Sequence, residues 1–158
     1  MTNLDRAIGL TQTIRDALAA EIAVAREERV LIRRMDADAL NARAQTRAVF
    51  NDKTAGLMAQ LGEVLGSAGQ DLGLPSVTLE ALQATAPQEG RRMAALLAEV
   101  RSLAAALAEL DALNRLLGQR ALSYVRSHLA ILSPKPAAYD RRGSGTAVPR
   151  TTTFVRVA

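Results

Sequence analysis

Apolar side chains recur at alternating steps of three and four residues over the last third of the chain before its final prolines. This spacing is typical of a heptad helix, in which one stripe of side chains faces a partner. An unbroken repeat of this length exceeds the usual 8 to 20 residues of a globular helix and predicts a coiled coil or a helical hairpin over residues 87–132. The seam positions are Met93, Leu96, Val100, Leu103, Leu107, Leu110, Asn114, Leu117, Ala121, Tyr124, His128 and Ile131.

The first 66 residues contain no proline and consist mostly of strong helix formers with charges of both signs. An apolar stripe is clear at the start and again near Phe50, Leu57 and Leu61, but it thins between Arg26 and Arg47. The pattern predicts one long helix over about residues 4–66, straight or bent, with a narrow buried seam in its middle.

Glycines at positions 62, 66 and 69, followed by Leu-Gly-Leu-Pro-Ser, predict the end of this helix. Ser76 or Thr78 can then cap a short helix over about residues 77–85, and Pro87 suits the first turn of the last helix. We therefore expect an all-α fold over residues 1–133, an elongated antiparallel hairpin or coiled coil of two long helices with a short helix between them.

Residues 134–158 differ from the rest of the chain in charge and composition. Residues 1–66 carry nine basic and nine acidic side chains and residues 67–133 carry six of each, so the net charge of +4 arises entirely after Ser133. Few apolar residues are present there to offset the entropy of ordering, which predicts a basic, largely disordered tail.

Composition removes several classes of function. The chain has no cysteine, which excludes disulfides and thiolate chemistry, and its start has no secretory signal pattern. The lone histidine, His128, falls on the seam and is interpreted as an ordinary helix residue, while the carboxylates lie among arginines as solvated faces. No phosphate-binding glycine motif appears. We expect a cytoplasmic protein that is not an enzyme and needs neither a cofactor nor a metal.

The last predicted helix has more apolar surface than one seam requires. The short helix, a second copy of the chain or the amphipathic helix of a partner could cover this surface. Leucines outside the seam include Leu97, Leu113, Leu116, Leu122 and Leu129.

The order of these features resembles the FlgN-type flagellar export chaperones. The resemblance rests on a long first helix, a glycine-rich break and a short helix, and then on a helix containing Leu113-Asn114-Arg115-Leu116-Leu117. A Leu-Ser-Pro stop and the segment Tyr139-Asp140-Arg141-Arg142-Gly143 complete it. Arg115 departs from the glycine that commonly follows this asparagine in the family.

The resemblance implies a cytoplasmic chaperone that binds the terminal helices of hook-filament junction proteins, prevents their premature association and delivers them to the flagellar type III export gate. In such chaperones the second half of the molecule holds the client, and a tyrosine after the last helix docks to the gate; Tyr139 matches that tyrosine. The client-binding residues implied are Leu103, Leu107, Leu110, Asn114, Leu117, Ala121 and Tyr124.

Two other functions fit the same sequence. A structural coiled-coil protein would homodimerise through the seam, and a helical nucleic-acid-binding protein would use the arginines of the tail. Asn114 is a polar residue at a seam position, where it costs stability unless it is hydrogen-bonded but can select a register or a partner. Its partner could be the chain's own hairpin or a client helix.

Overall fold

The computed structural model describes residues 2–132, which form four helices. The first helix, α1, spans Asn3–Arg34 and begins with a capping box in which Thr2 and Asp5 exchange hydrogen bonds. The backbone N–H and the hydroxyl of Thr2 donate to the Asp5 carboxylate, which lowers the pKa of Asp5. This cap is fully present at neutral pH and weakens only as the pH falls through the lowered pKa.

The predicted single helix over residues 4–66 is wrong, because α1 ends at Arg34 and a separate helix, α2, spans Ala37–Asp71. Met35 adopts a left-handed conformation with φ of 53°. The N–H of Asp36 bonds to the carbonyl of Leu31 and that of Met35 to Ile32, the pattern of a Schellman motif. The Asp36 side chain then caps α2 by accepting from the N–H of Ala39.

The second helix also ends later than its glycines suggested. α2 continues through the predicted stop at Gly62 and Gly66 to Asp71, and the same Schellman pattern then ends it around Gly73, at φ of +66°. Isolated glycines weaken a helix but do not end it, whereas a glycine in the left-handed region does. Gly73 therefore ends α2 in the same way that Met35 ends α1, with a residue in the left-handed conformation.

A short helix, α3, spans Leu79–Thr85, and of the two predicted caps it uses Thr78, whose hydroxyl accepts from Ala81. It crosses the start of α4, which spans Pro87–Leu132, at Gly90. A Cβ built on Gly90 would lie 2.7 Å from the backbone nitrogen of Gln83, so only glycine fits this crossing.

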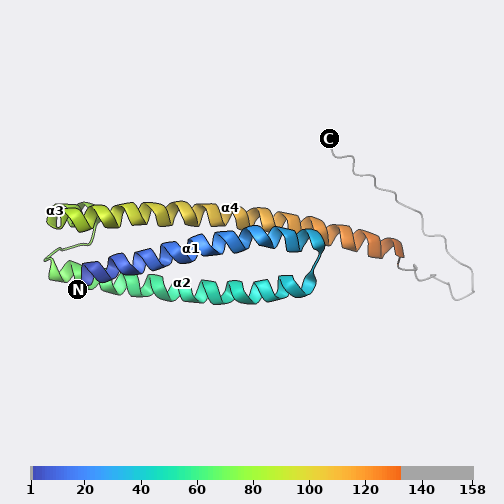
Figure 1. Cartoon of the computed structure of the whole chain (residues 1–158), viewed down its shortest axis with the longest axis horizontal. Helices are drawn as coiled ribbons and strands as arrows, with labels where there is room; N and C mark the ends of the chain where they lie inside the picture. The colour runs from blue at the N-terminus through green and yellow to red at the C-terminus, as the bar shows by residue number, and fades with distance from the viewer. Residues whose placement is uncertain (1, 133–158) are drawn as a thin grey trace, which may run out of the picture. The chain divides into compact units, whose positions relative to one another are not determined.

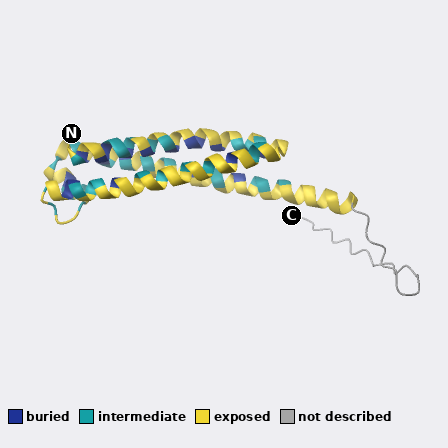
Figure 2. Cartoon of the chain, turned by 90° about the horizontal axis from the view of Figure 1, so that it is seen from below, coloured by how far each residue is buried: buried dark blue, intermediate teal, exposed yellow. Residues whose placement is uncertain are grey.

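The chain divides into one unit over Met1–Ser123 and a second that begins at Tyr124 and includes the end of α4. Within the first unit α1 and α2 are antiparallel, since Asn3 bonds to Asp71 whereas Glu21 bonds to Arg43. α4 runs parallel to α1 there, and the three long helices lie side by side (Figures 1 and 2). The all-α class, with long helices packed together, is confirmed.

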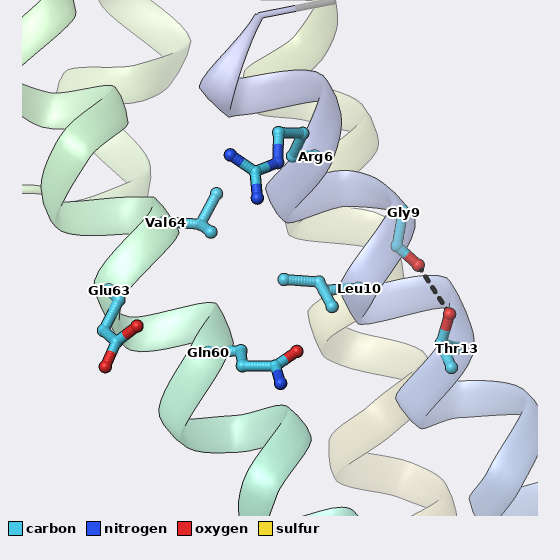
Figure 3. A pocket seen from close by; sticks show the side chains of 7 residues that line it. All are labelled: Arg6, Gly9, Leu10, Thr13, Gln60, Glu63 and Val64. Carbon is cyan, nitrogen blue, oxygen red and sulfur yellow. Dashed lines mark hydrogen bonds between the residues drawn. The ribbon is translucent and has the colours of Figure 1, made fainter.

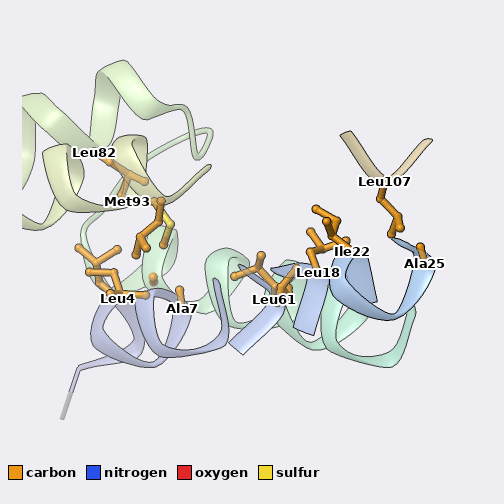
Figure 4. Packing of buried hydrophobic residues seen from close by; sticks show 13 residues of the cluster. Leu4, Ala7, Leu18, Ile22, Ala25, Leu61, Leu82, Met93 and Leu107 are labelled. Carbon is orange, nitrogen blue, oxygen red and sulfur yellow. The ribbon is translucent and has the colours of Figure 1, made fainter. Parts of the chain in front are cut away.

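The core of the first unit consists of one side-chain stripe from each long helix, closed at one end by α3. Figure 4 shows Leu82 of α3 and Met93 of α4 above Leu4 and Ala7 of α1. The α1 stripe also contains Thr11, whose hydroxyl donates to the Ala7 carbonyl at 2.8 Å and is therefore satisfied inside the core. The buried apolar side chains are Leu4, Ala7, Ile8, Ile14, Leu18, Ile22, Ala25, Ile32, Leu61, Ala68, Leu82, Met93, Leu96 and Leu107.

We predict that Gly90→Ala lowers the free energy of unfolding by about 1–3 kcal/mol, because its methyl group would collide with the backbone of α3 rather than with a movable side chain. Urea unfolding followed by circular dichroism measures this. Gly118→Ala is the matched control in the same helix, since a Cβ there meets nothing within 4 Å and should stabilise the helix by about 0.5–1 kcal/mol. Equal stability of the two variants would contradict the crossing.

Candidate functional site

A buried layer of charged side chains lies inside the three-helix unit. Glu21 of α1 replaces an apolar residue on the inner stripe, one residue before Ile22, and is buried. Two arginines on successive turns of α2 hold its carboxylate: Arg43, itself buried, and Arg47, at 2.8 Å. One buried carboxylate thus has two cationic hydrogen-bond donors, the condition under which a buried charge is tolerated.

The same layer reaches the third helix. The second guanidinium nitrogen of Arg47 donates to the carboxylate of Asp111 on α4, and the Nε of Arg43 lies 3.3 Å from the carboxylate of Glu28 on α1. Two arginines of α2 therefore connect carboxylates on both of its neighbours. Because each guanidinium has donors in a fixed plane, this arrangement specifies how far α1, α2 and α4 slide along one another.

Asn114 forms the next polar layer along α4. Its side-chain amide donates to the backbone carbonyl of Ala25 at 2.8 Å, and its carbonyl oxygen accepts from the Nε of Arg29 at 3.2 Å. Only 4% of its surface is exposed. The hydrogen bonds of Asn114 are thus supplied by the chain's own first helix, and they fix the parallel register of α1 and α4.

The structure places most of the predicted client-binding residues on this internal interface. Leu107 is 5% exposed and packs in the core, and the four half-buried members of the predicted set, Leu103, Leu110, Leu117 and Ala121, lie on the same seam. In this arrangement Leu107 and Asn114 are not accessible to a partner. Tyr124 differs from the rest, with 58% of its surface exposed, and Tyr139 lies outside the described residues.

The last described turns of α4, Tyr124–Leu132, are exposed along their whole length, and we call them the terminal segment. By helical spacing Tyr124, Val125, His128, Leu129, Ile131 and Leu132 share one face, and Arg126, Ser127 and Ala130 lie on the other. Ile131 and Leu132 are 79% and 76% exposed. The Tyr124 and His128 rings pack with centroids 4.1 Å apart, and His128 Nδ1 lies 3.1 Å from the Tyr124 carbonyl.

A shallow groove lies between α1 and α2, with Leu10 and Val64 pointing into it (Figure 3). Thr13 on its α1 wall donates its hydroxyl to the Gly9 carbonyl at 3.0 Å. Its remaining lining residues are Arg6, Gln60 and Glu63, which form no nucleophile–base pair. Across residues 2–132 no three His, Cys, Asp or Glu side chains come close enough to hold a metal ion. Among the described large apolar side chains, Ile131 and Leu132 of the terminal segment are the most exposed to solvent.

The sequence matches the FlgN protein family over residues 1–146. This chain belongs to the FlgN family. No match was found among curated proteins, and none among solved structures.

FlgN proteins are flagellar export chaperones, so the general role of this FlgN chain is to bind flagellar proteins and assist their export. FlgN is a family of chaperones rather than of enzymes. Among residues 2–132 no helix is long and apolar enough to span a membrane.

The charged layer was not predicted from the sequence, although two signals were present. Glu21 interrupts an otherwise apolar stripe, and Arg43 and Arg47 stand four residues apart and so share one face of a helix whose neighbours there are small or polar. A single long helix would have kept Glu21 and Arg43 about 33 Å apart along the axis, at 1.5 Å per residue. Only the chain reversal at Met35 brings them together.

We predict that Glu21→Leu or Arg43→Met each lowers the free energy of unfolding of this FlgN chain by about 1–3 kcal/mol, since each removes one partner of a buried ion pair and leaves the other held only by Glu28 or Arg47. The double variant Glu21→Leu, Arg43→Met should cost much less than the sum of the two, because the buried pair is removed together. Urea unfolding of the four proteins measures the coupling. Strict additivity would show that the two side chains are not paired in solution.

Proposed function

We propose that the chain is a cytoplasmic chaperone that holds the terminal helices of hook-filament junction proteins and delivers them to the flagellar type III export gate. The proposal is supported by membership of the FlgN family and by the resemblance of its carboxy-terminal third to chaperones that hold such clients. The structural observation that supports it is the exposure of the apolar side chains of the terminal segment within the described part of the chain.

The mechanism follows from the geometry of that face. An amphipathic client helix presents apolar side chains at steps of three and four, which match Val125, Leu129 and Leu132 when two helices lie together. Burying these side chains removes apolar area from water on both partners, at about 25 cal/mol per Å². The apolar face of the client helix is then shielded from other molecules. Because no covalent step is involved, the contact can be reversed at the export gate.

The inner seam, which is the part of the α4 heptad stripe from Met93 to Ala121 that packs within the chain, has a different role in this proposal. Leu107 and Asn114 already pack and bond within the chain, so client contact by these residues would require α4 to separate from α1. Such a separation would break the hydrogen bonds of Asn114 and expose the core around Leu107, at a cost of several kcal/mol. We therefore assign client docking to the terminal segment and register to the inner seam.

We expect the double variant Leu129→Glu, Ile131→Glu to bind a junction protein at least tenfold more weakly while retaining wild-type helicity and unfolding midpoint, because both side chains are exposed. Calorimetric titration against junction proteins that co-purify with the wild-type chain measures this. Val49→Glu on α2 is the matched control, since Val49 is 67% exposed and lies on another helix.

Several results would contradict this assignment. Unchanged affinity in the double variant would remove the terminal segment from the client site. Loss of affinity only in variants of the inner seam that remain folded, such as Leu107→Asn, would favour an opened α4. A constitutive dimer in solution that retains no junction protein would favour a structural coiled-coil protein.

Tyr139 is the proposed contact with the export gate, by its position after the last helix. Tyr139→Ala should leave client affinity unchanged but weaken binding of the loaded chaperone to the gate, as measured by co-purification with a gate component. Tyr124→Ala should weaken client binding but leave gate binding unchanged, because Tyr124 belongs to the client-binding face. Loss of both activities in Tyr139→Ala would give the tail a different role.

A further inference from the structure

An open pocket lies beside the charged layer, in the unit that ends at Ser123. Its volume is about 490 Å³. Leu40, Ala44 and Ala48, which follow one another at one-turn steps along α2, form its apolar wall. The rest of its lining is polar or charged and consists of Glu28, Arg43, Arg47, Asn51, Asp111 and Arg115. The pocket therefore combines an aliphatic wall with a set of hydrogen-bond donors.

Arg115 differs from the other two arginines of this pocket because no described carboxylate lies within 4 Å of it. Asp111 precedes it by four residues on α4, the spacing at which an acidic and a basic side chain pair on one helix. The Asp111 carboxylate accepts a hydrogen bond from Arg47 of α2 instead. Because α2 occupies the nearest partner on its own helix, the guanidinium of Arg115 has its donors available at the pocket.

A second donor belongs to Arg43. Its side chain is only 8% exposed, and its Nε is buried without a hydrogen-bond partner among the described residues. The Glu28 carboxylate lies 3.3 Å from this Nε but does not accept a hydrogen bond from it. A buried N–H without an acceptor is unfavourable, so an acceptor atom that enters the pocket beside Glu28 is stabilised there.

We propose that this pocket binds a carboxylate on a short aliphatic stem, the chemistry shared by a glutamate side chain and a small organic acid. The planar guanidinium of Arg115 matches the two oxygens of the carboxylate. Arg43 Nε and the Asn51 amide are further donors in the lining, and the stem lies against Ala44 and Ala48. The site is separate from the terminal segment and does not depend on the proposed function.

The charges around the pocket favour one carboxylate over a phosphate. Glu21, Glu28 and Asp111 share Arg43 and Arg47, and Arg115 brings this group of six side chains to neutrality. Unfilled hydrogen-bond donors, rather than an excess of positive charge, therefore drive binding. The two carboxylates in the lining repel a doubly charged anion more strongly than a singly charged one.

The test is a titration of the nitrogen-15-labelled full-length chain with sodium acetate, sodium butyrate or sodium phosphate at constant ionic strength. The arginine Nε–Hε resonances follow it by NMR. Butyrate should shift the resonances of Arg115 and Arg43 and bind at least threefold more tightly than acetate, because its longer stem buries more apolar area against the alanines. Phosphate should bind more weakly than either acid.

Two variants of α4 separate this site from general charge effects. Arg115→Gln should weaken butyrate binding at least tenfold, because it removes the guanidinium that no described carboxylate satisfies. Arg101→Gln is the matched control, since it removes one positive charge from another exposed position of the same helix and should leave binding unchanged.

Two helical peptides that differ only in one Glu or Gln distinguish the sources of the carboxylate. A shift of the Arg115 resonance by the Glu peptide alone supports the proposal with a protein side chain as the ligand, and butyrate binding without discrimination between the peptides supports it with a free acid. Absence of a shift with both acids and both peptides, unchanged binding in Arg115→Gln, or tighter binding of phosphate would overturn the proposal. Retention of a junction protein by Arg115→Gln would leave the chaperone function standing in each of these cases.

Discussion

The carboxylate of Glu21 determines how the three long helices are arranged. It is buried, so it must be paired, and the two arginines that pair with it stand on successive turns of α2. Because Arg47 also reaches Asp111, the same two turns of α2 specify the position of α4. Apolar stripes of leucine and alanine are tolerant of sliding, whereas planar guanidinium pairs are not. The charged layer therefore specifies the register of the three helices, whereas burial of the apolar core supplies most of the free energy that holds them together.

The two ends of α4 have opposite surroundings. Near its start Gly90 admits α3 so closely that no side chain fits, and Met93 and Leu96 are buried. At its end Tyr124, Ile131 and Leu132 are exposed. One helix thus contributes both to the stable core and to the surface that we propose for a client. A substitution in the terminal segment can change binding without unfolding the chain, which is what a carrier of helical cargo needs.

The sequence predicted much of this fold. The three-four repeat over residues 87–132 depends on local spacing alone, and α4 covers that range. The polar seam residue Asn114 was predicted to need a hydrogen-bond partner, and Ala25 and Arg29 supply it. The break at Met35 was missed because its left-handed position holds a methionine, where glycine or asparagine is the usual signal. Two weaker signals were available: Asp36 as a helix cap and the thinning of the apolar stripe between Arg26 and Arg47.

What the sequence determined by itself is periodic or compositional: helices rather than strands, the seam of the last helix, the absence of cysteine chemistry and the family of export chaperones. What only the tertiary structure decided is which of two apolar surfaces of α4 faces inward. The seam that looked available to a client is covered by α1, because the reversal at Met35 supplies a helix to pack there. Spacing along a helix defines its faces, but only the elements folded against it determine which face remains exposed to solvent.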